Sequence, residues 1–275
     1  MKKIELLLEE QQNYFMREAF NTLRTNILFS GKDVKSIIIT SCVAHEGKTT
    51  ISFETARNLA ESGKKVLLLD ADLRKSVMVS RYTKVRGIAG LSQVLSGQVS
   101  IDDAICKTQI DGLDIVFAGP YPPNPTELVG SPAFKEILDA KRDQYDYILI
   151  DAAPLGMVID AAVMASVCDG AILVLTSGTI KYRFAQSVKQ QLQKSGCKIL
   201  GTVLNQVSHR TMTGSPYYTA QKYETVYDHM VKQPAPASRP TTAPAATRQA
   251  PAARDARPVA QRPATPSENQ KQSNQ

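Results

Sequence analysis

Three short segments of this chain place lysine, hydroxyl or carboxylate groups directly after an apolar run. Residues 41–50 end in Glu-Gly-Lys-Thr-Thr and follow Ser-Ile-Ile-Ile-Thr. Residues 70–74 read Asp-Ala-Asp-Leu-Arg after Val-Leu-Leu-Leu, and residues 151–154 read Asp-Ala-Ala-Pro after Tyr-Ile-Leu-Ile. A loop with a lysine, combined with acidic strand ends, is typical of a site that binds a nucleoside triphosphate together with magnesium.

The first segment predicts a phosphate-binding loop between a strand and a helix. In such a loop the backbone N–H groups and the helix N-terminus face the phosphates. Lys48 would contact the β- and γ-phosphates, and Thr49 would give its hydroxyl to Mg²⁺. The strict pattern has glycine where this chain has Cys42, so a chance Gly-Lys-Thr at a helix start is the alternative. The predicted nucleotide contacts in this loop are Glu46, Gly47, Lys48, Thr49 and Thr50.

The acidic strand ends predict the groups that handle the metal and the proton. Asp151 follows four apolar residues, which is the usual place for a carboxylate that supports magnesium. Asp70 and Asp72 lie on alternate positions at a strand end, so both carboxylates can face the γ-phosphate. One of them could hold Mg²⁺ while the other accepts a proton from an attacking hydroxyl. The alternative is that the pair only caps a loop.

Short apolar runs alternate with helical stretches from Ser36 to Asn205. The runs are rich in Val, Ile and Leu with little alternation, as expected of strands that are buried on both faces. Helices between successive strands imply parallel pairing with right-handed crossovers. The predicted strands are 36–40, 65–69, 114–118, 147–150, 171–176 and 199–204. We therefore predict an α/β P-loop NTPase fold with a mostly parallel sheet flanked by helices.

An amphipathic helix is predicted before the first strand, over residues 13–30. Met16, Phe20, Leu23 and Ile27 repeat at helical spacing and form its apolar face. A polar stripe, consisting of Glu18, Asn21 and Arg24, lies beside that face. The spacing suits a contact with a neighbouring subunit, and a solvated helix face is the alternative.

Composition divides the chain into a folded body and a tail. Hydrophobic residues make up 43% of the 275, enough for a sizeable core, and the apolar runs are too short to span a bilayer. Residues 233–275 contain eight of the fifteen prolines and no aromatic residue, Leu or Ile, so we expect this tail to be disordered. The tail carries about four of the seven net positive charges, so the body is not strongly basic and nucleic acid is not an expected partner. Four scattered cysteines indicate reduced thiols in a cytosolic protein.

Four segments, in this order along the chain, resemble the motifs of the bacterial tyrosine kinase (BY-kinase) family. They are the Walker A loop at 41–50, the Walker A′ motif at 70–74, Pro-Pro-Asn-Pro-Thr-Glu-Leu-Val at 122–129, and the Walker B motif at 151–154. The resemblance covers about residues 14–207. It implies a P-loop tyrosine kinase domain over residues 1–207, a tyrosine-rich segment over 208–232, and the Pro/Ala-rich tail, which lies outside the usual pattern.

The resemblance also implies an activity and the residues that perform it. It implies ATP and Mg²⁺ as cofactors, Asp70 as the base toward tyrosine, and Asp72 as a magnesium partner. Asn205 lies where related P-loop proteins contact the adenine, and a simple turn is the alternative. The acceptors would be a C-terminal tyrosine cluster, phosphorylated in trans within a ring-shaped homo-oligomer. These tyrosines are Tyr217, Tyr218, Tyr223 and Tyr227.

The resemblance finally implies a setting for the enzyme. The split Gram-positive form of the family works in the cytoplasm, docks on a separate membrane adaptor of the polysaccharide chain-length-regulator type, and is opposed by a cognate tyrosine phosphatase. The role would be regulation of extracellular or capsular polysaccharide synthesis or export. In the family's Glu-x-x-Arg-x-x-Arg oligomerisation motif the middle arginine is replaced here by Asn21.

Two other classes of protein share parts of this pattern. A MinD/ParA-like ATPase, acting in positioning or as a scaffold at the membrane, has the same fold but carries an extra lysine where this chain has Val43. Such ATPases also lack a terminal tyrosine cluster. A non-catalytic scaffold would be free to lose Lys48, Asp70 and Asp151, all of which are present. The tyrosine kinase is therefore the preferred interpretation.

Overall fold

The computed structural model describes residues 2–8 and 14–207. Within these residues the chain forms one eight-stranded sheet in the order β1-β4-β5-β3-β6-β2-β7-β8. The strands are β1 (Lys2–Lys3), β2 (Ser36–Ser41), β3 (Val66–Asp70), β4 (Cys106–Lys107), β5 (Leu113–Val116), β6 (Tyr147–Asp151), β7 (Gly170–Thr176) and β8 (Ile199–Asn205). Every neighbouring pair is parallel except β4 and β5, which are antiparallel.

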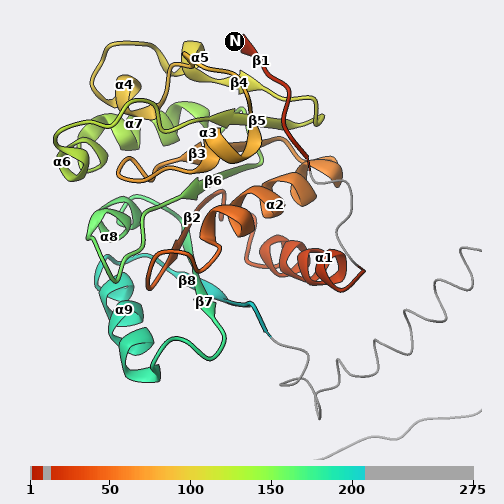
Figure 1. The fold of residues 1–275 in the computed structure, drawn as a ribbon, viewed down its shortest axis with the longest axis vertical. Helices are drawn as coiled ribbons and strands as arrows, with labels where there is room; N and C mark the ends of the chain where they lie inside the picture. Colours follow the sequence, from red (N-terminus) through yellow and green to blue (C-terminus); the bar gives the residue numbers. More distant parts are fainter. Residues whose placement is uncertain (1, 9–13, 208–275) are drawn as a thin grey trace, which may run out of the picture. The chain divides into compact units, whose positions relative to one another are not determined.

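Helices cover both faces of this sheet (Figure 1). They are α1 (Tyr14–Leu28), α2 (Lys48–Glu61), α3 (Met78–Tyr82), α4 (Leu91–Leu95), α5 (Ile101–Ala104), α6 (Pro125–Val129), α7 (Pro132–Lys141), α8 (Asp160–Ala165) and α9 (Tyr182–Lys194). Side chains of α1, α2 and α3 share one buried cluster with one face of the sheet. Side chains of α4 to α9 share a second cluster with the other face. Strands β2, β3 and β6 are buried throughout because they are covered on both sides.

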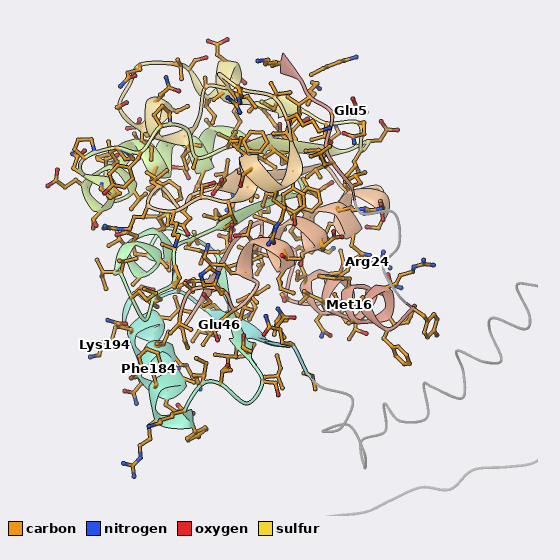
Figure 2. The ribbon with its side chains drawn as sticks, in the orientation of Figure 1. Glu5, Met16, Arg24, Glu46, Phe184 and Lys194 are labelled. Atoms are coloured by element: carbon orange, nitrogen blue, oxygen red, sulfur yellow. The ribbon has the colours of Figure 1, made fainter. Side chains whose placement is uncertain are left out.

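The predicted α/β fold is confirmed, and all six predicted strands are present within two residues of their expected ends. Two strands were not predicted. β1 and β4 have two residues each and pair with one another at the edge of the sheet, too short to leave a hydrophobic pattern. The predicted first helix is α1, whose Phe20 and Ile27 are buried. Met16 was expected on the same apolar face, but it is 39% exposed near the start of the helix (Figure 2).

The strand order determines which strand ends meet. β6 lies between β2 and β3, so Asp151 is the register partner of both Ile39 and Asp70. Because the three strands are parallel, their carboxyl ends lie along the same edge of the sheet, as expected for ligand sites in open α/β sheets. The phosphate loop and the two acidic strand ends are therefore brought together. No helix in the described part of the chain is both long enough and apolar enough to cross a membrane.

Candidate functional site

The loop from β2 to α2 has a backbone that only particular residues can adopt. His45 and Gly47 both have left-handed backbone angles, with φ of 66° and 86°. A Cβ atom on Gly47 would lie 2.2 Å from Nδ2 of Asn205, so a side chain at this position would displace the Asn205 amide as well as strain the backbone. The Asn205 amide in turn donates a hydrogen bond of 2.9 Å to the carbonyl oxygen of Glu46. Asn205, at the end of β8, thus holds the loop from the side.

The Glu46 carboxylate organises this loop from within rather than facing outward. Glu46 is 2% exposed, and its Oε2 accepts hydrogen bonds from the backbone N–H groups of Cys42 at 2.6 Å and Val43 at 2.8 Å. Its Oε1 accepts a third bond, of 2.9 Å, from the N–H of Thr176 at the end of β7. Glu46 was predicted among the residues of the nucleotide-binding loop, and its carboxylate is engaged by three backbone N–H groups of the protein.

The helix that follows the loop presents a free N-terminus. α2 begins at Lys48 after Gly47, and no side chain caps its first turn. A helix of 14 residues with uncapped N–H groups attracts anions through those groups and through its dipole. The hydroxyl of Thr49 and the ammonium of Lys48 stand beside this end, with Nζ of Lys48 3.5 Å from Oγ1 of Thr49.

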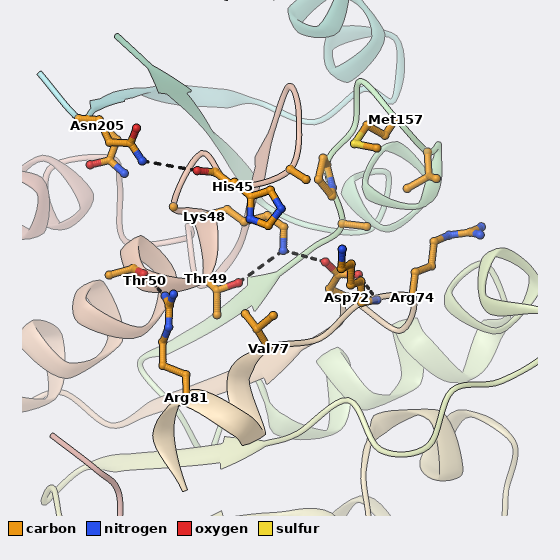
Figure 3. A pocket seen from close by; sticks show the side chains of 17 residues that line it. His45, Lys48, Thr49, Thr50, Asp72, Arg74, Val77, Arg81, Met157 and Asn205 are labelled. Carbon is orange, nitrogen blue, oxygen red and sulfur yellow. Dashed lines mark hydrogen bonds and ion pairs between the residues drawn. The ribbon is translucent and has the colours of Figure 1, made fainter. Parts of the chain in front are cut away.

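Lys48 lies between two carboxylates from two different strands. Its Nζ is 2.8 Å from Oδ2 of Asp72 and 3.8 Å from Oδ1 of Asp151. Burial alone would lower the pKa of Lys48, but the charges of Asp151 and Asp72 outweigh it and raise the pKa above its ordinary value. Lys48 therefore carries a positive charge in a largely buried position, as Figure 3 shows at the centre of the pocket.

Asp70 and Asp151 form a buried acidic pair on neighbouring strands. Asp70 is 0% exposed and Asp151 is 1% exposed. Burial first, and the charge of Asp151 second, raise the pKa of Asp70 to about 7. Burial also raises the pKa of Asp151, although Lys48 acts in the opposite direction. Each of these two carboxyl groups has one buried oxygen, Oδ1 of Asp70 and Oδ2 of Asp151, without a hydrogen-bond partner among the described residues.

Asp70 and Asp72, which were predicted at a strand end from which both carboxylates can face the γ-phosphate, lie in different positions relative to the pocket. Asp72 lines a pocket of about 530 Å³ that opens beside the phosphate loop, whereas Asp70 lies beneath the surface and does not line it. Asp72 turns outward because its backbone has left β3, which ends at Asp70. Its Oδ1 accepts a hydrogen bond of 3.0 Å from the N–H of Lys75 in the following turn. The pocket is also lined by Lys48, Thr49, Thr50, Arg81, Met157 and Asn205 (Figure 3).

Arg74 connects the segment after β3 to two helices on the other face of the sheet. Its guanidinium donates to both carboxylate oxygens of Asp160, at 2.7 and 3.1 Å. It also donates to Oγ1 of Thr126 at 2.7 Å, and the Thr126 hydroxyl donates to Asp160 at 2.7 Å. Burial would raise the pKa of Asp160, but the hydrogen bonds from Arg74 and Thr126 hold it below its ordinary value. This triad explains why the Pro-rich segment at 122–129 belongs to the site, since Thr126 lies within it.

The residues present fit a magnesium nucleotide. No group of three or more His, Cys, Asp or Glu side chains within residues 2–8 and 14–207 could hold a metal ion unaided. Magnesium does not require such a cage, because it is commonly held by one or two carboxylates together with substrate phosphates and water. Thr49, Asp72 and Asp151 could provide this partial set, and the partnerless Oδ2 of Asp151 gives an oxygen free for an ordered water. The uncapped helix N-terminus and Lys48 provide for the phosphates.

Sequence reasoning identified the main groups of the site and missed several that support them. Lys48, Thr49, Asp72 and Asp151 are brought together, and Thr50 and Asn205 line the same pocket. The supporting residues that were not predicted are Ser52, which donates to Asp151 at 3.2 Å, and Ser76, Arg81, Thr126 and Asp160. Thr126 lies within the segment at 122–129, whereas the others belong to no recognised motif and only their positions in the fold reveal them. The four predicted acceptor tyrosines at 217–227 lie outside the described residues.

The predicted polar stripe on α1 is partly used inside the molecule. The Asn21 amide donates to Oε1 of Glu18 at 2.9 Å, and its oxygen accepts a bond of 3.3 Å from Asn58 on α2. Asn21 and Arg24 are half-buried, whereas Glu18 is exposed. Only part of the stripe is thus available to a neighbouring subunit (Figure 2 labels Arg24).

The fold and this site define a P-loop nucleotide-binding protein. The family model described as an AAA domain matches residues 34–195. The tyrosine-protein kinase CpsD of Streptococcus agalactiae serotype Ia is 44% identical over 196 residues, which is 71% of this chain and 84% of that protein. Among solved structures, the chimerical protein CapA2B2 superposes with a TM-score of 0.68 at 31% identity and covers 75% of this chain and 94% of that one.

The septum site-determining protein MinD of Pyrococcus horikoshii, solved in complex with Mg-ADP, is more distant. It has a TM-score of 0.55 and 27% identity and covers 69% of this chain and 76% of that one. The identity to CpsD over most of both chains shows the family. The protein belongs to the bacterial tyrosine-protein kinases, and the resemblance stated from its motifs is confirmed.

Proposed function

We propose that this kinase transfers the γ-phosphoryl group of ATP to tyrosines in its own residues 217–227. One observation carries the proposal: a buried lysine ammonium stands at an uncapped helix N-terminus, 2.8 Å from one acidic group and 3.8 Å from another, beside an open pocket. This combination of fixed positive charge, helix dipole and carboxylates is what phosphoryl transfer needs, because catalysis there consists mainly of positioning and charge stabilisation. Tyr217, Tyr218, Tyr223 and Tyr227 lie shortly after β8, whose end faces this pocket through Asn205.

The phosphate groups would be held by the loop and the first turn of α2. Backbone N–H groups of Gly47, Lys48, Thr49 and Thr50 lie where a triphosphate can accept their hydrogen bonds. The Lys48 ammonium neutralises charge that develops on the transferred group. Asn205 holds the loop through its bond to the carbonyl oxygen of Glu46, lines the same pocket, and would contact the adenine base. Glu46 acts on the loop itself through its three bonds to backbone N–H groups.

Magnesium would be held by a small set of oxygens around Lys48. The Thr49 hydroxyl and the Asp72 carboxylate are the groups on the pocket wall, and Asp151 supports them from below. Bound Mg²⁺ supplies charge that offsets the phosphates, while the protein supplies orientation. Asp70, next to Asp151, serves as the acceptor of the tyrosine proton in this proposal.

We propose the cellular setting from the family resemblance. The kinase would work as a ring-shaped homo-oligomer at the inner face of the membrane, bound to an adaptor of the polysaccharide chain-length-regulator type. A tyrosine phosphatase would reverse its phosphorylation, and the cycle would control extracellular or capsular polysaccharide synthesis or export. Phosphate adds about −1.5 to −2 charges per tyrosine, so phosphorylation of the cluster would loosen the assembly through repulsion. Light scattering of the phosphorylated and dephosphorylated forms tests this, with a larger mass expected for the dephosphorylated form.

The test of the proposed reaction is an incubation of the full chain with ATP and Mg²⁺, followed by mapping of phosphorylated residues. Phosphotyrosine within residues 217–227 is expected. Asp70→Asn should bind the nucleotide nearly as well as the wild type but lose phosphoryl transfer, because the phosphate cradle stays while the proton acceptor is removed. Normal transfer by Asp70→Asn would exclude Asp70 as the proton acceptor.

A further inference from the structure

In the proposed kinase reaction, on which this inference rests, Asp70 accepts the tyrosine proton. The tyrosine hydroxyl must therefore have access to the Asp70 carboxyl group. The carboxyl group is 0% exposed, and Asp70 does not line the pocket proposed for the nucleotide. An acceptor hydroxyl of a tyrosine therefore cannot reach it directly in the described arrangement. A proton can still reach Asp70 if another side chain connects it with the surface.

Ser76 makes that connection. Its hydroxyl donates a hydrogen bond to Oδ2 of Asp70, across six residues of the segment that leaves β3. Ser76 itself is exposed, and both of its neighbours, Lys75 and Val77, line the pocket. Ser76 is thus the exposed residue that is hydrogen-bonded to the buried Asp70.

The hydrogen bonds of Ser76 leave room for one more donor. A serine hydroxyl has one proton to donate and two lone pairs that accept. The proton goes to Asp70, and one lone pair accepts the backbone N–H of Met78 at 3.2 Å, which fixes the hydroxyl at the start of α3. The second lone pair has no partner among the described residues. It can accept the O–H of an incoming phenol.

We propose that Ser76 is a catalytic proton relay between the acceptor tyrosine and Asp70. As the phenolic oxygen bonds to phosphorus and the bond to the leaving diphosphate oxygen breaks, the phenolic proton moves to Oγ of Ser76. In the same step the Ser76 hydroxyl proton moves to Oδ2 of Asp70, so the serine ends as a neutral hydroxyl. Asp70 later gives its proton to solvent, and ADP leaves with the electron pair of the broken bond.

The relay depends on the hydroxyl and not on the fold of α3, and variants can separate the two. Ser76→Ala removes the hydroxyl, whereas Ser76→Thr keeps it. Ser80→Ala is the matched control, because Ser80 is an exposed serine four residues further on, within α3, and its hydroxyl donates to the Val77 carbonyl oxygen at 2.9 Å. Single-turnover phosphorylation of tyrosine in the full chain gives the rate. Titration with a fluorescent ADP, in which no transfer occurs, gives nucleotide affinity.

Proton transfer by a positioned group contributes roughly 100-fold or more, so Ser76→Ala should lower the rate constant of transfer by roughly 100-fold. Its affinity for ADP should stay within about twofold of the wild type, since Ser76 does not line the pocket. Ser76→Thr should recover most of the rate, and Ser80→Ala should match the wild type. Asp70→Asn combined with Ser76→Ala should be no slower than Asp70→Asn alone, because both changes break the same path.

Two results would overturn the relay. One is a Ser76→Ala rate within about threefold of the wild type, and the other is a double variant whose loss equals the product of the two single losses. A wild-type chain that forms no phosphotyrosine would overturn the proposed function, and the relay with it. An active wild type with a fully active Ser76→Ala variant would overturn the relay alone.

Discussion

The burial of Asp70 predicts that the nucleotide-free protein becomes less stable as the pH rises from 5 to 8. In the folded chain burial and Asp151 raise the pKa of Asp70 from 3.8 to about 7, whereas in the unfolded chain it returns to its ordinary value. Above the ordinary pKa the unfolded state has already lost this proton and the folded state still holds it. A rise in pH therefore favours unfolding until the folded pKa is passed.

The size of this effect follows from the separation of the two pKa values. A pKa of about 7 in the folded chain against 3.8 in the unfolded chain corresponds to about 4 kcal/mol in total, and about 3 kcal/mol of this falls between pH 5 and pH 8. Solvent does not appreciably screen the interactions of the Asp70 carboxyl group, because Asp70 is 0% exposed. Asp160 and Asp169, whose pKa values are lowered, have the opposite sign but act in more acidic solution.

Urea unfolding at pH 5 and pH 8, with a chelator and no nucleotide, measures the effect. The free energy of unfolding of the wild type should fall by about 3 kcal/mol more than that of Asp70→Asn, which has the same shape and no charge to lose. Asp70→Asn should be the more stable protein at pH 8. Equal losses in the two proteins, within about 0.5 kcal/mol, would refute the account of Asp70 as a buried carboxyl group whose pKa is raised to about 7 in the folded chain.

Three further outcomes follow from the site geometry. Gly47→Ala should abolish nucleotide binding in a fluorescence titration. Gly63→Ala should lose only stability, because this glycine has the same φ of 86° but no atom lies within 4 Å of the new Cβ. Equal nucleotide binding by the two variants would contradict a steric role for Gly47. Arg74→Ala should lower the free energy of unfolding in urea by roughly 3 kcal/mol, and Asp160→Ala by roughly 1–2 kcal/mol. Arg74→Ala leaves the Asp160 carboxylate, which is 3% exposed, without its cation, whereas Asp160→Ala leaves an arginine that is 33% exposed and stays hydrated. A larger loss for Asp160→Ala would contradict this explanation. Glu46→Ala should cost about 2–4 kcal/mol of thermal stability by leaving three backbone N–H groups unpaired, and an unchanged melting temperature would show that the loop does not need its carboxylate.

The strands and the residues at their ends could be predicted from the sequence because strands that are buried on both faces appear as uninterrupted apolar runs. Runs such as 66–69 and 147–150 are apolar on both faces, and the aspartate that follows each run marks the edge of the sheet. The position of Asp151 in the site follows from the same reasoning. The two-residue strands β1 and β4 are too short to form an apolar run. The parallel pairing of β1 with β4 and the antiparallel pairing of β4 with β5 depend on where the rest of the chain lies.

The support of the site could not be predicted because it depends on side chains far apart in sequence. β6 inserts between β2 and β3, which brings Asp151 against Asp70, and the charge of Asp151 adds to burial in raising the pKa of Asp70. The period of a strand predicts that Asp70 and Asp72 point the same way, but the strand ends at Asp70 and only Asp72 reaches the pocket. The bond between Arg74 and Asp160 spans 86 residues and has no signature in either segment.

The most direct measurement of the central claim is a map of phosphorylated residues in the full chain after incubation with ATP and Mg²⁺, compared with Lys48→Met. The wild type should carry phosphotyrosine confined to residues 217–227. Lys48→Met should carry none, because the ammonium that neutralises the phosphates is gone while a side chain of similar length remains. Phosphate only on serine, threonine or tyrosines of the folded body, or equal phosphorylation of Lys48→Met, would contradict the account.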